Sequence, residues 1–485
     1  MKYCLFTFLL LFIVFVIPAQ CVLEEKISID LSDTTLTVYA SQSIEANSAI
    51  TGAVKVQFQA GSEITFLPEF YATGGIELLA KIAPCPDSLY TIIANIPQNE
   101  GLTGKAKNIW DLQIYKGKLY LGYGSTTRNT GPTALWAYDL ATETLATNCI
   151  IASEAIERFR VWNDTLFIPN SDPTSGDLPK FVYLAEEEVC QSISINYGMA
   201  HVRDLYFFNG QYYLVGNTRC PGSKEPNCAG LISLTNFSGN IDNTWLQSEL
   251  VMADNFSNSR WNWFFGLLEV DGQLVLPNAM FTKAYNPNLA IKDNLFYQIE
   301  PNNELTWSAF QPPNKRLLHT HFFPVDTTQT EVTDTAGLFT SLRIFEHASF
   351  NNKTLYALRT YSMFNAYYQA QYNNSAGLVL KDSLRGAAKM VNFPATNAIG
   401  EDLKIINNEL YVLANEKITT NSFKIYVYKT TAPTAEAASW TEVLQLDSKN
   451  MARSFEYANG FFYFGLGFNE GEEVQKAGQL IRVKE

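Results

Sequence analysis

Residues 110–125 read WDLQIYKGKLYLGYGS, and this pattern recurs along most of the chain. Apolar residues alternate with other residues on both sides of Lys116-Gly117. A Lys-Gly pair supplies the positive backbone φ angles that a two-residue hairpin turn requires. The stretch therefore predicts two antiparallel strands joined by a tight turn.

Six further copies follow at intervals of about 45 to 80 residues, which is the range expected of repeated supersecondary units. Each copy places a turn rich in Gly, Asn or Asp between two apolar strands. The copies read ERFRVWNDTLFIPNSD (157–172), VRDLYFFNGQYYLVGN (202–217), FGLLEVDGQLVLPNAM (265–280), FEHASFNNKTLYALRT (345–360), EDLKIINNELYVLANE (401–416) and RSFEYANGFFYFGLGF (453–468).

Most of these hairpins are followed by another apolar strand, such as ALWAYDL (134–140) or KIYVYKT (424–430), which makes four-stranded units. Repeated four-stranded units without amphipathic helical runs predict an all-β fold, a β-propeller of about seven blades over residues 87–485. An array of β-sandwiches is the alternative, but no Pro- or Ser-rich linker separates the units. The long interval that contains residues 314–344 leaves room for an insertion or a degraded eighth blade.

The segment before the repeats differs in kind, because short β-runs broken by glycine fill residues 43–85. It resembles the coathanger-stack module of secreted Bacteroidota proteins in Ala60-Gly61-Ser62, Phe66, Gly74-Gly75 and Pro84-Cys85. The resemblance implies a small module of stacked β-rungs over residues 21–86 in an exported protein. It implies nothing about chemistry.

Residues 1–20 have the features of a signal peptide, with Lys2 before the apolar run 5–17 and Pro18-Ala19-Gln20 before Cys21. The run is too short for a membrane span, and no later window is long and apolar enough for one. We expect a protein that is secreted or held at the cell envelope. Lipid attachment at Cys21 is the less favoured route, because Gln20 is not a small residue.

The charge balance excludes one class of partner. The formal net charge is −13, and removal of residues 1–20 leaves 34 basic against 48 acidic residues. Nucleic acid is not expected as a partner, because phosphate binding depends on basic patches. Neutral or cationic ligands fit such a field better. No phosphate-binding glycine loop and no CxxC pair occurs, so we expect no cofactor and no metal.

Cysteine spacing suggests disulfides in an oxidising compartment. Cys220 and Cys228 enclose a short polar loop and are expected to bond to each other. Cys149–Cys190 and Cys21–Cys85 then follow by elimination.

The repeats provide a register for guessing the channel-lining residues of a propeller. The positions aligned at the starts of the inner strands are Asp111, Arg158, Asp204, Gly266, Glu346, Asp402 and Arg453. Such a ring could bind a polar ligand at one mouth of the channel, or its members could form structural ion pairs with each other.

Aromatic residues give the argument for a carbohydrate, because Trp and Tyr present flat apolar faces to sugar rings. Trp261 and Trp263 precede the fourth inner strand, and Tyr367 and Tyr368 lie among Asn and Gln in a connection of the fifth unit. We therefore predict a binding protein, rather than an enzyme, that recognises a polysaccharide or a surface protein. The rival is an extracellular lyase or glycoside hydrolase, in which His201, Arg203 and Arg158 could act with a tyrosine. A purely structural surface protein is the third alternative.

Overall fold

The computed structural model contains β-strands throughout the part of the chain that it describes, with short 3₁₀ turns and no α-helix. No helix in that part is long and apolar enough to cross a membrane. The described residues are 22–27, 31–32, 36–46, 49–51, 55–60, 63–68, 71–73, 77–82, 90–96, 108–124, 131–174, 180–184, 190–194, 199–218, 228–235, 247–253, 266–277, 296–301, 305–307, 321–322, 338–364, 371–419, 422–468 and 478–485.

The chain divides into two compact units, Met1–Thr91 and Ile92–Glu485. The strands of the first unit pair in parallel and form two sheets. Ile44 and Phe58 are fully buried there. One sheet contains β1 (Val22–Ile27), β3 (Leu36–Ala46), β5 (Lys55–Ala60), β6 (Glu63–Phe66) and β8 (Glu77–Ile82), and the other contains β2 (Leu31–Ser32), β4 (Ala49–Thr51) and β7 (Tyr71–Thr73).

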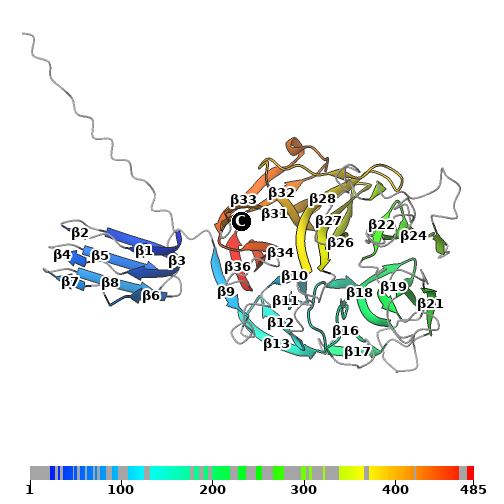
Figure 1. The fold of residues 1–485 in the computed structure, drawn as a ribbon, viewed down its shortest axis with the longest axis horizontal. Coiled ribbons are helices and arrows are strands. Elements are labelled where there is room, and N and C mark those ends of the chain that lie inside the picture. Colours follow the sequence, from blue (N-terminus) through cyan, green and yellow to red (C-terminus); the bar gives the residue numbers. More distant parts are fainter. Residues whose placement is uncertain are drawn as a thin grey trace, which may run out of the picture. The chain divides into compact units, whose positions relative to one another are not determined.

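The second unit is a β-propeller, in which four-stranded sheets follow one another around a centre in sequence order (Figure 1). Among the described residues, six of these sheets are built from four consecutive strands. They are sheet 1, β10 (Ile109–Tyr115), β11 (Lys118–Tyr123), β12 (Thr133–Asp139) and β13 (Thr144–Ile151); sheet 2, β14 (Arg160–Trp162), β15 (Thr165–Ile168), β16 (Lys180–Leu184) and β17 (Cys190–Ser194); sheet 3, β18 (Met199–Phe208), β19 (Gln211–Thr218), β20 (Cys228–Thr235) and β21 (Gln247–Ala253); sheet 4, β22 (Leu268–Val270), β23 (Gln273–Pro277), β24 (Phe296–Ile299) and β25 (Leu305–Trp307); sheet 5, β26 (Leu338–Phe350), β27 (Lys353–Phe364), β28 (Gln371–Lys381) and β29 (Lys389–Met390); and sheet 6, β30 (Ile399–Ile406), β31 (Glu409–Thr419), β32 (Ser422–Thr430) and β33 (Thr441–Ser448).

Sheet 7 joins the two ends of this unit. Its first three strands are β34 (Met451–Ala458), β35 (Phe461–Gly467) and β36 (Gln479–Lys484), and its fourth is β9 (Thr91–Asn95) from the beginning of the unit. Pairing of β36 with β9 closes the ring and covers a sheet edge that would otherwise be open.

The predicted hairpin turns are confirmed by the backbone, since both central residues of each turn have positive φ. This geometry matches the right-handed twist of the flanking strands. The turn residues are Lys116-Gly117, Asn163-Asp164, Asn209-Gly210, Asp271-Gly272, Asn351-Asn352, Asn407-Asn408 and Asn459-Gly460.

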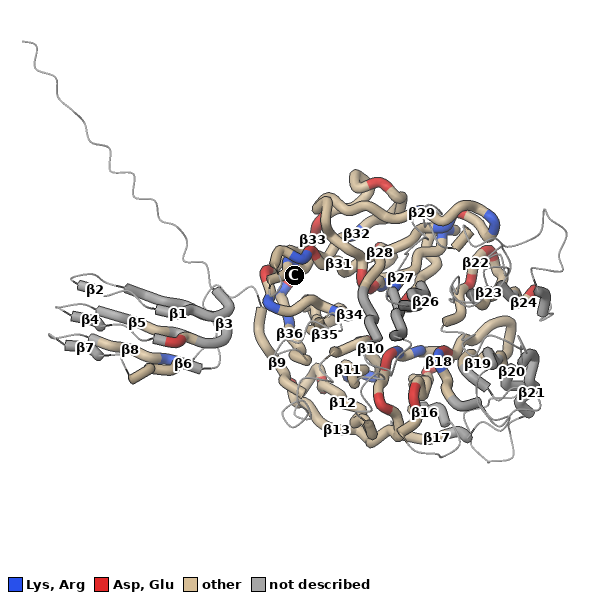
Figure 2. The backbone as a smooth tube through the Cα atoms, in the orientation of Figure 1, with Lys and Arg blue, Asp and Glu red and all other residues tan. Residues whose placement is uncertain are grey.

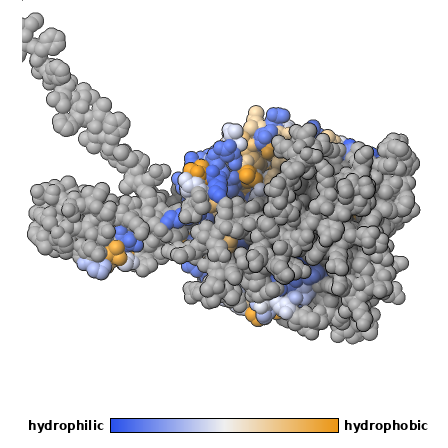
Figure 3. Space-filling model, in the orientation of Figure 1, coloured by the Kyte–Doolittle hydropathy of each residue, from blue (hydrophilic) through white to orange (hydrophobic). Residues whose placement is uncertain are grey.

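The cores lie between neighbouring sheets, where apolar residues of adjacent sheets interlock. Leu166 and Ile168 of sheet 2 pack with Leu135 and Ile151 of sheet 1, and all four are at most 1% exposed. The apolar residues of the repeats therefore provide the side chains that pack between neighbouring sheets. On the surface that Figure 3 shows, the described hydrophobic residues are scattered among hydrophilic ones.

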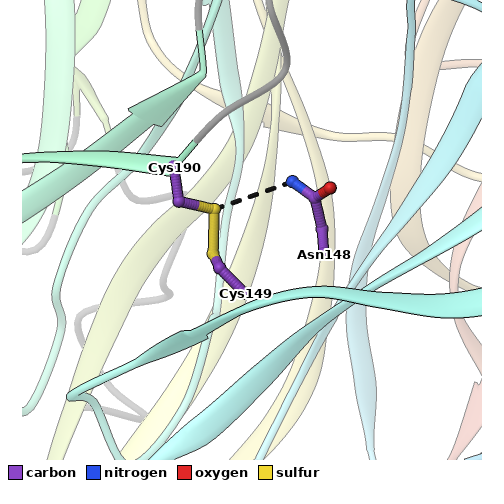
Figure 4. The surroundings of a disulfide bond; sticks show 3 residues. All are labelled: Asn148, Cys149 and Cys190. Carbon is purple, nitrogen blue, oxygen red and sulfur yellow. Dashed lines mark hydrogen bonds between the residues drawn. A yellow bond between two sulfur atoms is a disulfide. The ribbon is translucent and has the colours of Figure 1, made fainter.

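The predicted disulfide between Cys149 and Cys190 is present (Figure 4). It joins β13 to β17, the outermost strands of two neighbouring sheets, and Asn148 Nδ2 lies 3.6 Å from Cys190 Sγ. Cys21, Cys85 and Cys220 lie outside the described residues, so the pairings Cys21–Cys85 and Cys220–Cys228 stay predictions.

Candidate functional site

Five inner strands carry a β-bulge, which lies near the beginning of β10, β18, β30 and β34 and in the middle of β26. A bulge inserts an extra residue and re-aims the side chains around it. The channel end at which these strands begin therefore receives polar side chains from several sheets, while the opposite end is formed by two-residue turns.

Three of the aligned acids have the same hydrogen-bonding role. Asp111 Oδ2 accepts from the Phe159 amide at 2.7 Å, Asp204 Oδ2 from Leu267 at 3.0 Å, and Asp402 Oδ2 from Phe455 at 3.0 Å. In each case the donor lies in, or directly before, the inner strand of the next sheet around the ring. These carboxylates therefore join neighbouring sheets.

The seventh member of the aligned set needs a correction. Asp111 lies five residues before its turn, and the residue five before Asn459 is Ser454, not Arg453. Ser454 follows the bulge of β34 and donates from Oγ to the Ile109 carbonyl oxygen at 3.0 Å, which joins sheet 7 to sheet 1. Arg453 occupies the bulge itself, the position that Trp110 and Glu401 hold in their strands.

A central ion cluster consists of Arg158, Arg160, Asp204 and Glu346. Arg160 Nε lies 3.1 Å from Asp204 Oδ1 and its Nη1 lies 2.8 Å from Glu346 Oε2, while Arg158 Nη1 pairs with Asp204 Oδ2. In Figure 2 acidic and basic stretches of backbone adjoin near β18 at the centre of the ring. Burial opposes ionisation of Asp204, but the two guanidinium groups lower its pKa overall.

Gly266 provides space for this cluster. A Cβ atom there would lie 2.9 Å from the Ile344 carbonyl oxygen, 3.4 Å from Arg158 Nη1 and 3.6 Å from Asp204 Oδ2. A side chain at this aligned position would press on the ion pair, so the glycine is part of the cluster's packing.

Two further carboxyl groups beside Lys404 have raised pKa values. Lys404 Nζ lies 3.2 Å from Glu456 Oε1 and 3.6 Å from Asp111 Oδ1. Burial raises the pKa of Asp111 to about 6 and that of Asp402 to about 8, against the opposing charge of Lys404. At both of these carboxyl groups the effect of burial exceeds the attraction of Lys404.

An arginine pair, Arg359 and Arg453, shares the single carboxylate of Glu401. Arg359 Nη2 lies 2.8 Å and Arg453 Nη1 3.0 Å from Glu401 Oε1, and all three side chains are at most 1% exposed. The guanidinium carbon of Arg359 lies 3.4 Å from the centre of the Phe345 ring, and that of Arg453 lies 5.0 Å from the Trp110 ring.

A partly exposed polar group lies between sheets 2 and 3, where β15 ends and β18 begins. His201 Nδ1 lies 3.1 Å from the Ser171 carbonyl oxygen and 3.4 Å from Asp172 Oδ1, and the side chains of His201 and Asp172 are 22% and 23% exposed. Burial, aided by Arg203, lowers the pKa of His201 to about 3. Because a carbonyl oxygen only accepts, the neutral ring carries its proton on Nδ1 and keeps Nε2 as its acceptor.

The predicted site residues thus fall into two groups. Asp111, Arg158, Asp204, Glu346 and Asp402 are buried and converge on the centre of the ring, bonded to one another or to neighbouring sheets. A ligand role for them stays a prediction. Trp261, Trp263, Tyr367 and Tyr368 lie outside the described residues. Within the described ranges no group of three or more His, Cys, Asp or Glu is arranged to hold a metal ion.

Sequence reasoning missed Arg160, Lys404 and Glu456, which lie three residues before their turns and reach the same centre. Counting back from the positive-φ turn, rather than from the start of each copy, would have found them. Arg359 lies on a second strand, β27, so no alignment of inner strands could have identified it.

No model of a known protein family matches this chain, and no curated protein matches it. Among solved structures, the polysaccharide lyase Uly1 is similar over 78% of this chain and 90% of its own, with 10% identity and a TM-score of 0.41. The β-propeller domain of the Trilobed protease from Pyrococcus furiosus is similar over 78% of this chain and 95% of its own, with 8% identity and a TM-score of 0.41.

A GH74 xyloglucanase from Xanthomonas campestris is similar over 78% of this chain but only 52% of its own, with 10% identity and a TM-score of 0.42. At these identities and scores the similarities assign no activity to this chain. Its fold rests on its own strand pairing.

Proposed function

We propose that this chain is a secreted, seven-bladed β-propeller that binds a glycan at the channel end where its inner strands begin, with the N-terminal unit as a spacer. Seven four-stranded sheets among the described residues support the blade count. The Cys149–Cys190 bond and the predicted signal peptide support export, because disulfides persist in oxidising compartments.

The observation that carries the binding site is the polar group His201, Asp172 and Arg203. It offers an imidazole acceptor and a carboxylate at partial exposure, backed by buried Arg203, which lies 4.0 Å from Glu157. Sugar hydroxyl groups bind to such mixed donors and acceptors, whereas the central ion cluster has its charges mutually paired.

The test is calorimetric titration of the purified mature chain with neutral and acidic polysaccharides. His201→Ala and Asp172→Ala should each weaken binding by about tenfold, the value of one lost hydrogen bond to a charged or well-aligned partner. Arg482→Gln, which breaks the ion pair between β36 and Glu143 in the turn before β13, is the matched control and should bind as wild type. Absence of binding to every polysaccharide, or full binding by both site variants, would reject the proposal.

A second function, lyase activity, is favoured by one observation, the occurrence of His201 and the buried cation of Arg203 in one polar group. A neutral imidazole can remove a proton next to a carboxylate whose charge an arginine offsets. Incubation with uronate-containing polysaccharides, followed by ultraviolet absorbance of unsaturated products, separates the two functions. Product formation that His201→Gln abolishes would establish the lyase.

A further inference from the structure

Two short segments meet beside the polar group, one from sheet 1 and one from sheet 2. Residues 152–155 follow β13, and residues 170–174 follow β15. The Glu154 amide donates to the Asp172 carbonyl oxygen at 2.8 Å, and the two segments also form an antiparallel bridge. Backbone contacts from sheet 1 therefore hold the segment that carries Asp172.

Ser153 is a fully buried residue in the middle of this contact. Its Oγ donates to the Ala155 carbonyl oxygen at 2.8 Å, and it lies 3.3 Å from the carbonyl oxygen and 3.5 Å from the amide nitrogen of Asp172. The carbonyl oxygen of Ser153 accepts from Thr133 Oγ1 of β12 at 2.8 Å. Ser153 is therefore fixed by sheet 1 and touches the backbone of Asp172.

Two glycines beside the strands of sheet 1 allow this close approach. A Cβ atom at Gly131 would clash with the Ser153 carbonyl oxygen and with Thr174 Cγ2. A Cβ atom at Gly124, where φ is 118°, would lie 2.7 Å from Ala155 Cα. Because closely packed interiors transmit small displacements, a change at Ser153 should reach the backbone of the neighbouring segment.

The same segment also holds His201. His201 Nδ1 lies 3.1 Å from the Ser171 carbonyl oxygen, and the Val202 amide donates to the Asn170 carbonyl oxygen at 2.9 Å. Burial and the charge of Arg203 lower the pKa of His201 to about 3, so the ring is neutral at pH 7. The Ser171 carbonyl oxygen therefore selects the tautomer that has its proton on Nδ1.

We propose that Ser153 is a positioning residue for the polar group, and that it holds the Ser171 carbonyl oxygen where this oxygen fixes the tautomer and orientation of the His201 ring. A hydrogen bond is lost when its length grows beyond about 3.5 Å, so a small displacement of the carbonyl group releases Nδ1. The effect of Ser153 on glycan affinity rests on the proposed function, whereas its effect on the ring does not.

The test is nuclear magnetic resonance of the mature chain with isotopically labelled histidine at pH 7, because the shifts of the ring nitrogens report the tautomer. The chain contains four histidines, and the signals of His201 are those that His201→Gln lacks. The wild type should carry the proton on Nδ1. Ser153→Ala should move the tautomer equilibrium about fivefold toward a proton on Nε2, the value of one lost neutral hydrogen bond.

Ser454→Ala is the matched control, since Ser454 is also buried and donates from Oγ to a carbonyl oxygen, that of Ile109. It should lower the Tm by a similar amount and leave the His201 tautomer and the glycan affinity unchanged. Ser153→Ala should weaken glycan binding about fivefold, less than the loss of about tenfold expected for His201→Ala. An equal tautomer change in both serine variants would reflect general loosening and overturn the proposal.

A second variant covers the case that Ser153→Ala does not fold. Thr133→Val has a similar shape, removes the bond to the Ser153 carbonyl oxygen and should move the His201 tautomer in the same direction. Its control is Thr165→Val, at a buried threonine of β15 whose hydroxyl donates to the Asn163 carbonyl oxygen at the hairpin turn. A tautomer that neither Ser153→Ala nor Thr133→Val changes would overturn the proposal.

The two readouts separate this role of Ser153 from the proposed function. If the wild type binds no polysaccharide while Ser153→Ala shifts the His201 tautomer, the proposed function fails and the positioning role stands. If glycan affinity falls in Ser153→Ala without a tautomer change, Ser153 does not act through His201 and the positioning role is rejected.

Discussion

Individual charged residues at the centre of this propeller differ in how well they are compensated. Asp204 is fully buried and keeps a lowered pKa because Arg158 and Arg160 both contact it. Asp402 is equally buried but faces Lys404 together with two other acids, Asp111 and Glu346, and its pKa rises to about 8. The two carboxyl groups have similar backbone bonds, so the neighbouring charges determine which of them ionises.

This difference predicts a pH dependence that belongs to Asp402. A carboxyl group with a raised folded-state pKa binds a proton that the unfolded chain has released, so stability falls as pH rises from 3.8 to about 8. Burial lowers the pKa of His201 to about 3 and that of His347 to about 4, so these groups make stability rise with pH. Their contribution ends at about pH 6.5, the pKa of histidine in the unfolded chain. Burial raises the pKa of Asp111 to about 6, so the loss of stability that this group causes is largely complete at pH 6.5.

Between pH 6.5 and 8 the free energy of unfolding should therefore fall by about 2 kcal/mol, at 1.4 kcal/mol for each pH unit. Urea denaturation across this range measures the slope. Asp402→Asn should flatten it, even if the variant starts from a lower stability. Asp139→Asn, at an acid whose pKa is lowered by hydrogen bonds from the amides of Thr142 and Ala141, should keep the wild-type slope. A wild-type curve that is flat over this range would contradict the assignment.

At the scale of the strand, the same arrangement recurs in several inner strands. Directly after the bulge comes a side chain that forms a hydrogen bond with the backbone of the next sheet. Asp111, Asp204 and Asp402 each accept the backbone amide of the neighbouring inner segment, and Ser454 donates to a carbonyl oxygen instead. The bulge turns these side chains sideways out of their own sheet. The repeat therefore encodes contacts between sheets as well as the strands themselves.

Asp111→Ala tests this role, because it leaves the buried Phe159 amide without an acceptor. We expect a loss of about 1–3 kcal/mol in the free energy of unfolding, measured with urea. Asp111→Asn retains one acceptor oxygen and should recover more than half of the loss. Equal stability of the Ala and Asn variants would show that the amide bond contributes little and that the charge beside Lys404 matters instead.

The strands and turns were predictable from sequence because their determinants are local. Alternation of apolar residues and turn pairs such as Asn209-Gly210 act within about fifteen residues, which is the span of one hairpin. The bulge register was not read correctly at Arg453, since one inserted residue shifts every later side chain. The pairing of Arg160 with Glu346, 186 residues apart, depends on closure of the ring and has no local signal.

At the scale of the whole propeller, closure depends on one short strand from the beginning of the unit. β9 completes sheet 7, and Asn95 Oδ1 accepts from Gln479 Nε2 at 2.9 Å across a separation of 384 residues. Ile96 donates its amide to the Gly478 carbonyl oxygen and packs with Leu119 and Leu480, so this segment contacts both sheet 1 and sheet 7.

Ile96→Asp should therefore destabilise the entire propeller rather than one edge. Ile96 is 2% exposed, and a carboxylate there would be buried without a partner, which should cost about 3 kcal/mol or more. Thermal unfolding should remain a single transition at a lower Tm, because loss of β9 exposes the edge of β36 and separates sheet 7 from sheet 1. Thr91→Asp, at an exposed position of the same strand, should leave the Tm unchanged. If the variant instead shows a small early transition followed by the main transition at the wild-type Tm, the ring holds without this strand.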